Sequence, residues 1–209
     1  MLEIAVVDYE MGNLYSVVRA LQFLGVKPVI VKTPEELEKA NAIILPGVGA
    51  FDPAINQLRQ RQLVDPIRNF ILEDKPFLGI CLGLQLLFDK SEEGNENGLG
   101  ILRGNVKKFK TEPNVAIPHM GWNQLKINTN NSNCMLWKGL KENPWVYFVH
   151  SYYVTPLDKS VEVATVLHGT QEVVAAVARK NLVAVQFHPE KSVNVGLQIL
   201  KNFVSTCSC

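Results

Sequence analysis

The stretch Pro76-Phe77-Leu78-Gly79-Ile80-Cys81-Leu82-Gly83-Leu84-Gln85 places a cysteine between two glycines in an apolar run. The pattern Gly-x-nucleophile-x-Gly is typical of a strand that turns sharply into a helix, where the glycines keep side chains clear of the crowded turn. The sequence therefore predicts a strand, a tight elbow at Cys81 and a helix, with the sulfur presented to solvent.

Two features of the predicted elbow would activate Cys81. The unpaired N–H groups and the positive dipole end of the following helix favour thiolate over thiol. The backbone N–H of Leu82 is placed to stabilise an oxyanion. Taken alone, however, a free cysteine in an apolar run is more often a small buried hydrophobic residue.

A candidate base and a carboxylate follow another apolar strand, 182–185, in the segment Gln186-Phe187-His188-Pro189-Glu190. In an extended segment, residues i and i+2 point to the same side, so Glu190 would orient the imidazole of His188 toward the sulfur. A lone histidine near a strand end is more often structural. The elbow, its helix and this segment together predict a nucleophile system of Cys81, His188 and Glu190.

The first half of the chain alternates strands and helices. The run Thr33-Pro34-Glu35-Glu36 has the signature of a capping box at a helix start. Such alternation indicates an α/β fold with a mostly parallel central sheet flanked by helices, whose ligands bind at the carboxyl ends of the strands. The predicted strands are 4–7, 29–31, 42–45 and the elbow strand, and the predicted helices are 14–24, a short helix from 34 and a helical region up to 72.

The second half changes to short β segments separated by polar turns. These segments predict an antiparallel β extension of the parallel sheet, followed by a helix over about 193–204. We expect a single domain over residues 1–209. The predicted strands are 106–109, 124–127, 145–149, 152–155, 163–167, 173–178 and 182–185.

The loop Pro46-Gly47-Val48-Gly49-Ala50-Phe51 has two interpretations. It is either a plain strand-to-helix turn or a loop whose backbone N–H groups complete an oxyanion hole beside the elbow. No Gly-Lys-Ser/Thr follows it, and the chain has no dinucleotide fingerprint. We therefore expect no phosphate or dinucleotide cofactor at this loop.

Composition excludes several classes of function. The chain has 209 residues and a net charge of +1, so nothing indicates nucleic-acid binding. No apolar run reaches the roughly 18 to 20 residues that span a bilayer, and no signal-like segment begins the chain. We expect no membrane association, no metal site and a cytoplasmic location, since the spacing of the cysteines suggests neither disulfides nor zinc. The four cysteines are Cys81, Cys134, Cys207 and Cys209.

The acidic segment after Ser91, which contains Glu92 and Glu93, has no evident function. A charge run of this kind is by default a solvated loop. The tail cysteines Cys207 and Cys209 likewise suggest no role.

The elbow and the His-Pro-Glu segment resemble those of the class I glutamine amidotransferases. Further segments, spread over essentially the whole chain, are similar to those of the glutaminase subunits of imidazole glycerol phosphate synthase. This resemblance implies a flavodoxin-like sheet. These segments are Asp8-Tyr9-Glu10-Met11-Gly12-Asn13-Leu14, the loop 46–51, Pro118-His119-Met120-Gly121-Trp122-Asn123, Phe148-Val149-His150-Ser151-Tyr152-Tyr153 and His188-Pro189-Glu190-Lys191-Ser192.

The resemblance implies a mechanism. Cys81 would attack the side-chain amide carbon of glutamine to form a glutamyl thioester, with His188 as acid and base and Glu190 orienting it. His150 would be structural or interfacial rather than the base. The implied oxyanion hole is Val48, Gly49 and Leu82, and the implied substrate-binding residues are Gly47, Gln85, Ser151 and Tyr152.

The resemblance also implies a partner, the (β/α)8-barrel cyclase subunit of imidazole glycerol phosphate synthase, in a heterodimer. Ammonia released into neutral water is quickly protonated, so the acceptor must receive it directly. The docking face would include Asn13, Trp122, Tyr147 and Lys191, although a core position is the alternative for Trp122.

Three other functions stay open at this stage. They are the glutaminase subunit of another class I amidotransferase, a cysteine peptidase or amidohydrolase of related fold, and a non-catalytic subunit. Gln85 and Glu190 favour a glutaminase over a peptidase, and the intact triad disfavours a non-catalytic subunit.

Overall fold

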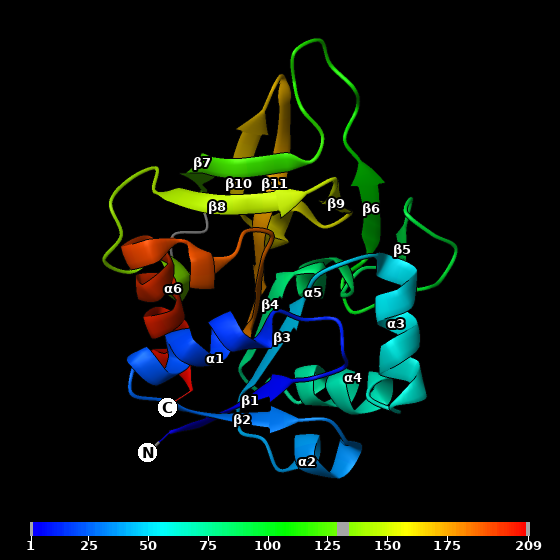
Figure 1. Ribbon diagram of the computed structural model, residues 1–209, viewed down its shortest axis with the longest axis vertical. Coiled ribbons are helices and arrows are strands. Elements are labelled where there is room, and N and C mark those ends of the chain that lie inside the picture. Colours follow the sequence, from blue (N-terminus) through cyan, green and yellow to red (C-terminus); the bar gives the residue numbers. More distant parts are fainter. Residues whose placement is uncertain (1, 129–133, 208–209) are drawn as a thin grey trace.

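The computed structural model describes residues 2–128 and 134–207, so Cys209 lies outside the described residues. A nine-stranded sheet runs through the molecule in the order β2-β1-β3-β4-β12-β11-β10-β7-β8 (Figure 1). Its strands are β1 (Glu3–Val7), β2 (Lys27–Val31), β3 (Ile43–Gly47), β4 (Phe77–Cys81), β7 (His119–Ile127), β8 (Trp145–His150), β10 (Glu162–His168), β11 (Gln171–Arg179) and β12 (Leu182–Val185).

The sheet has a parallel half and an antiparallel half, which confirms the predicted fold class. Strands β2, β1, β3, β4 and β12 pair in parallel. From β12 onward, β11, β10, β7 and β8 pair antiparallel. Strand β12 (182–185) therefore pairs in parallel with β4 on one side and antiparallel with β11 on the other. The parallel pairing places the carboxyl end of β12 beside that of the elbow strand β4.

A second, three-stranded sheet was not predicted. It contains β5 (Lys90–Ser91), β6 (Gly104–Lys108) and β9 (Tyr152–Pro156) in the order β5-β6-β9. The predicted strands 106–109 and 152–155 pair here instead of extending the main sheet. Strand alternation does not specify which sheet a short strand joins, because pairing is decided by long-range contacts.

Helices cover both faces of the parallel half (Figure 1). Ile44 packs with residues of the helices α1 and α6 on one face, whereas Ile43 and Leu45 pack with residues of α3 and α4 on the other. Each of these three side chains is fully buried. Strands buried on both faces read as continuous apolar runs, as observed in 43–45. The helices are α1 (Leu14–Phe23), α2 (Pro34–Glu38), α3 (Phe51–Gln60), α4 (Val64–Leu72), α5 (Leu82–Gln85) and α6 (Val193–Thr206), with 3-10 turns η2 (Met135–Trp137), η3 (Lys159–Val161) and η4 (Pro189–Lys191).

The predicted capping box of α2 is present. The Thr33 hydroxyl accepts from the backbone N–H of Glu36 at 3.4 Å, and the Glu36 carboxylate accepts from that of Thr33 at 3.2 Å. Pro34 occupies the start of the helix. Reciprocal capping satisfies N–H groups that a helix start otherwise leaves unpaired.

The helix after the elbow packs directly on β3, which predicts the effect of a small substitution. A Cβ atom at Gly83 would collide with the backbone carbonyl oxygen of Leu45. Gly83→Ala should therefore lower the free energy of unfolding by about 2 kcal/mol or more, as overpacking against backbone does. Gly12→Ala is the control, since its nearest contact would be an ordinary 3.5 Å to Leu14. Chemical denaturation of both variants measures the two free energies of unfolding. Equal values would contradict the close packing of Gly83 against Leu45.

Candidate active site

The elbow at Cys81 is confirmed. Cys81 ends β4 and precedes α5, with φ +54° and ψ −108°. This is an unusual backbone conformation for a residue with a side chain, of the kind that persists where surrounding structure enforces it. The helix that follows has only four residues. Its dipole is consequently weaker than the sequence indicated.

The sequence predicted that the sulfur would be presented to solvent, and this prediction is wrong. Cys81 is only 6% exposed. It opens onto a cavity of about 290 Å³ that is roofed by the end of β8 and the start of β9, a long-range arrangement that no local pattern shows. The cavity is lined by Val48, Gly49, Cys81, Leu82, Gln85, Glu93, Pro118, Val149, His150, Ser151, Tyr152 and His188.

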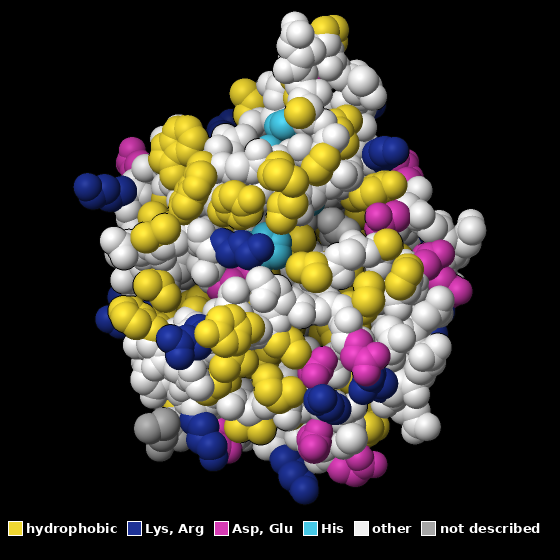
Figure 2. All heavy atoms as spheres, in the orientation of Figure 1, with side chains coloured by type: hydrophobic (Ala, Val, Ile, Leu, Met, Phe, Trp, Pro, Cys, Tyr) yellow, Lys and Arg dark blue, Asp and Glu magenta, His cyan; other side chains and the backbone are white. Residues whose placement is uncertain are grey.

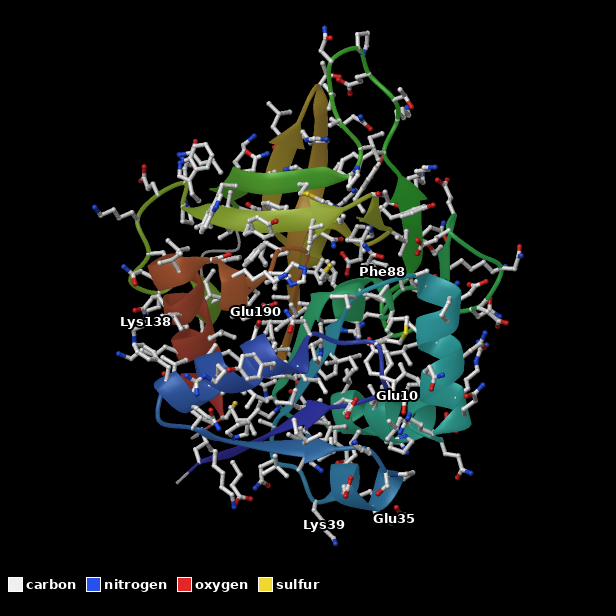
Figure 3. All side chains as sticks on the ribbon, viewed as in Figure 1. Glu10, Glu35, Lys39, Phe88, Lys138 and Glu190 are labelled. Atoms are coloured by element: carbon white, nitrogen blue, oxygen red, sulfur yellow. The ribbon has the colours of Figure 1, made fainter. Side chains whose placement is uncertain are left out.

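The structure brings His188 and Glu190 together. His188 Nδ1 lies 2.7 Å from Glu190 Oε1, and both side chains are 2% exposed. The segment is not extended as predicted: a 3-10 turn begins at Pro189, directly after His188. Glu190 lies in the interior, between α1 and β8 (Figure 3).

Burial and hydrogen bonding act in opposite directions on His188. Burial disfavours its charged form, but interactions with the Cys81 sulfur and the Glu190 carboxylate outweigh this and raise the pKa of His188 to about 10. Its Nε2 atom is buried and has no aligned hydrogen-bond partner among the described residues. Because Nδ1 is bound to Glu190, Nε2 is the ring nitrogen left to act on the sulfur or on a reacting group in the cavity.

The predicted oxyanion residues line the cavity, but one of them is engaged elsewhere. The backbone N–H of Val48 donates to the Met11 carbonyl at 2.7 Å. Gly49 has φ +96°, a conformation that favours glycine. In this state the Val48 N–H is not available to an oxyanion.

The predicted substrate residues separate into two groups. Gln85, Ser151 and Tyr152 line the cavity. Gly47 does not: a Cβ there would meet the buried Tyr9 hydroxyl and the Leu82 side chain. The structure thus gives Gly47 a close-packing role, and the prediction that it binds substrate lacks geometric support.

The orientation of the Gln85 amide follows from its partners. Its Nε2 atom donates to the Tyr152 carbonyl oxygen and to Gln186 Oε1, each at 3.1 Å. Both N–H bonds are thereby used. The side-chain oxygen of Gln85 is left as an acceptor.

Glu93 is a cavity residue that sequence reasoning missed, and the prediction of a solvated loop is wrong for it. Its carboxylate accepts from the Phe51 N–H at 2.8 Å, at the start of α3. Asp52 accepts from the N–H groups of Asn95 and Glu96 and ties the same loop to the helix. The sequence signal was weak, because acidic runs are usually solvated.

His150 has a structural role, as expected. Its Nδ1 donates to the Tyr152 carbonyl at 2.8 Å, so its Nε2 is the acceptor for His119 Nδ1 at 3.1 Å. Burial lowers the pKa of His150 to about 3 and that of His119 to about 4. Both rings are neutral near pH 7, which fits hydrogen bonds in which each ring donates once and accepts once.

Three of the four predicted interface residues form one cluster. The rings of Trp122 and Tyr147 lie 6.1 Å apart across β7 and β8, and the Lys191 ammonium lies 6.0 Å from the Tyr147 ring. Trp122 is 47% exposed, which excludes the core alternative. Hydrophobic side chains gather over β7 and β8 on this face (Figure 2), where Met120 and Trp145 are also exposed.

Asn13 lies in the loop that enters α1, and its amide donates to the Ser16 hydroxyl at 3.1 Å. Within residues 2–128 and 134–207, no cluster of metal-ligating side chains occurs. No helix in the described part of the chain is long and apolar enough to cross a membrane.

Sequence comparison finds relatives over nearly the whole chain. The family model for glutamine amidotransferase class-I matches residues 5–207. The imidazole glycerol phosphate synthase subunit HisH of Nostoc punctiforme is 60% identical over 202 residues, which are 97% of this chain and 95% of that protein. The corresponding subunit of Cyanophora paradoxa is 57% identical over 203 residues, 97% of this chain and 94% of that protein.

Structural comparison shows the same fold. A crystal structure of a glutamine amidotransferase matches with a TM-score of 0.75 at 21% identity, over 98% of this chain and 99% of that chain. The structure of PurLQS from Thermotoga maritima matches with a TM-score of 0.76 at 19% identity, over 98% of each chain.

The protonation of His188 gives a direct test of the site. By NMR of ring nitrogens, His188 should stay protonated until the pH approaches about 10, whereas His150 stays neutral until the pH falls toward about 3. Cys81→Ala should lower the pKa of His188, because it removes an interaction that favours the charged ring. Cys134→Ala is the control and should change nothing.

The same pKa shift has a consequence for stability. Because the pKa of His188 is raised in the fold from 6.5, its stabilising contribution is complete below about pH 6.5 and is lost as the pH rises through about 10. If the His188 ring titrated near pH 6.5 in both the wild type and Cys81→Ala, that result would contradict the coupling of His188 to Cys81.

Proposed function

The chain belongs to the class I glutamine amidotransferases, and from that premise we propose that it hydrolyses glutamine through Cys81, His188 and Glu190 and passes the ammonia to a cyclase subunit. The observation that carries the proposal is the 2.7 Å pairing of His188 with Glu190 on a cavity that also contains the elbow cysteine. The relatives named imidazole glycerol phosphate synthase subunit HisH support a role in histidine biosynthesis.

In the first half-reaction, the Cys81 sulfur attacks the side-chain amide carbon of glutamine. The tetrahedral adduct collapses when the C–N bond breaks, and the departing nitrogen takes the proton from His188 Nε2 and leaves as ammonia. A glutamyl thioester on Cys81 remains. This step requires a proton on His188 Nε2, the ring nitrogen that Glu190 does not bind, and the raised pKa of His188 favours it.

In the second half-reaction, neutral His188 removes a proton from water, and the hydroxide oxygen bonds to the thioester carbon. The C–S bond then breaks, glutamate leaves, and the electron pair returns to sulfur. Glu190 accepts the Nδ1–H bond throughout, so Nε2 stays directed at the reacting atoms and the imidazolium charge is stabilised.

The cavity offers matched groups for the amino-acid end of glutamine. The carboxylate of Glu93 and the side-chain oxygen of Gln85 are acceptors that suit the α-ammonium group. Ser151 and Tyr152 line the same cavity and are placed to bind the remaining polar atoms. A glutamine residue inside a peptide lacks the free α-ammonium group, so this arrangement favours free glutamine over an internal residue of a peptide.

The oxyanion hole requires a local change. Leu82 would supply one backbone donor at the elbow, and the loop of Val48 and Gly49 would supply the other. The Val48 N–H must first leave the Met11 carbonyl, to which it donates at 2.7 Å. Met11 lies two residues before Asn13, so a partner that contacts Asn13 would be able to favour the released state.

The partner would dock on the Trp122–Tyr147–Lys191 cluster. This cluster combines exposed aromatic area with a cation, a composition enriched at interface hot spots. Lys191 follows Glu190 directly in η4, so the docked cyclase is placed to act on the catalytic segment. The isolated chain should accordingly be a poor glutaminase.

The experiment measures glutamate released from glutamine by wild-type, Cys81→Ala and Cys134→Ala proteins, each alone and with a (β/α)8-barrel cyclase subunit and its phosphoribosyl substrate. Wild type and Cys134→Ala should be slow alone and at least about tenfold faster with the partner, a typical coupling. Cys81→Ala should release none above background, because the nucleophile is lost.

Two results would contradict the proposal. Glutamate release by Cys81→Ala at the wild-type rate would remove the covalent mechanism. Full activity of the isolated chain, unchanged by the cyclase, would remove the coupling to a partner.

A further inference from the structure

Gln186 is a fully buried amide beside the nucleophile. It follows β12, which pairs in parallel with β4 so that Val185 lies opposite Ile80. The next residue along each strand is Gln186 on one and Cys81 on the other. The Nε2 atom of Gln186 lies 3.6 Å from the Cys81 sulfur, at the distance of an N–H···S hydrogen bond.

The hydrogen-bond network decides which end of this amide faces the sulfur. The Gln85 amide nitrogen donates to the Tyr152 carbonyl, so the other N–H of the same nitrogen meets the oxygen of Gln186 at 3.1 Å. A reversed Gln186 would oppose two donors at that contact. Its NH2 group is therefore held toward Cys81.

The Tyr152 carbonyl is itself fixed from the other side. It accepts from His150 Nδ1, His150 accepts from His119, and His119 Nε2 accepts from the Asn123 amide at 3.1 Å. A continuous polar chain thus runs from β7 through the substrate cavity to Gln186. Such fully satisfied buried networks hold their members in one orientation.

We propose that Gln186 is a further catalytic residue, whose amide N–H stabilises the negative charge on the Cys81 sulfur. The sulfur carries this charge when it acts as the nucleophile, and the charge returns when the thioester C–S bond breaks and the electron pair moves to sulfur. The hydrogen bond from Gln186 is strong to a thiolate and weak to the sulfur of a thioester. It therefore favours the thiolate both before the attack on glutamine and when the thioester breaks. This inference rests on the proposed glutaminase reaction.

A buried glutamine also stabilises a fold by packing, so the test must separate the two roles. The rate of Cys81 alkylation by iodoacetamide is measured against pH in the full-length chain without glutamine. Loss of a hydrogen bond to a charged group predicts a rate roughly tenfold lower near neutral pH in Gln186→Met, with the midpoint of the profile about one pH unit higher.

Two variants sharpen the comparison. Gln186→Glu keeps the volume of the side chain but brings a carboxylate to the sulfur, and it should slow alkylation further. Asn202→Leu is the matched control, since it removes a buried amide that donates to the Leu136 and Lys138 carbonyls away from Cys81. Its alkylation profile should match wild type.

An alkylation profile of Gln186→Met or Gln186→Glu identical to that of wild type would overturn the inference. An equal shift in Asn202→Leu would also overturn it, because the effect would then be general loss of packing. If Cys81 alkylation responds to Gln186 as expected but wild type with its cyclase releases no glutamate from glutamine, the proposed reaction fails and the role of Gln186 on the sulfur stands.

Discussion

The parallel pairing of β4 with β12 is the constraint on which the rest of the site depends. Because Val185 lies opposite Ile80, the two strands end together, and the residues that follow β12 reach the elbow of Cys81. One segment then delivers both the Gln186 amide and the His188 ring to the sulfur. A shift of this register by one residue would turn those side chains to the opposite face of the sheet.

Burial makes the charges of this site effective. His188 is almost inaccessible, so an isolated charge on its ring would be costly, and interactions with Cys81 and Glu190 offset that cost. The neutral His150 lines the opposite wall of the cavity, and the neutral His119 holds its ring in place. The site therefore contrasts a charged imidazole at the reacting atoms with neutral imidazoles that only hold the backbone.

Local signals in the sequence were sufficient for the elbow, the His188–Glu190 pair and most strand positions. They failed where distant segments decide the outcome. The roof over Cys81, the bond from Val48 to Met11, the second sheet and the placement of Glu93 all depend on contacts between residues far apart in the chain. Gln186 stands two positions before His188, where an extended segment would direct both side chains to the same side, and this signal was not used in predicting the site.

The central claim is that Cys81 is an activated cysteine in a cavity that binds glutamine, and selective labelling of Cys81 tests it most directly. Limiting amounts of a diazoketone analogue of glutamine are added, and the labelled residue is identified by mass spectrometry. Labelling should concentrate on Cys81, because burial disfavours the thiolate at the other described cysteines. Burial raises the pKa of the Cys207 thiol to about 11, and it also raises the pKa of the Cys134 thiol. Dominant labelling of Cys134 or Cys207 at limiting reagent would contradict the account.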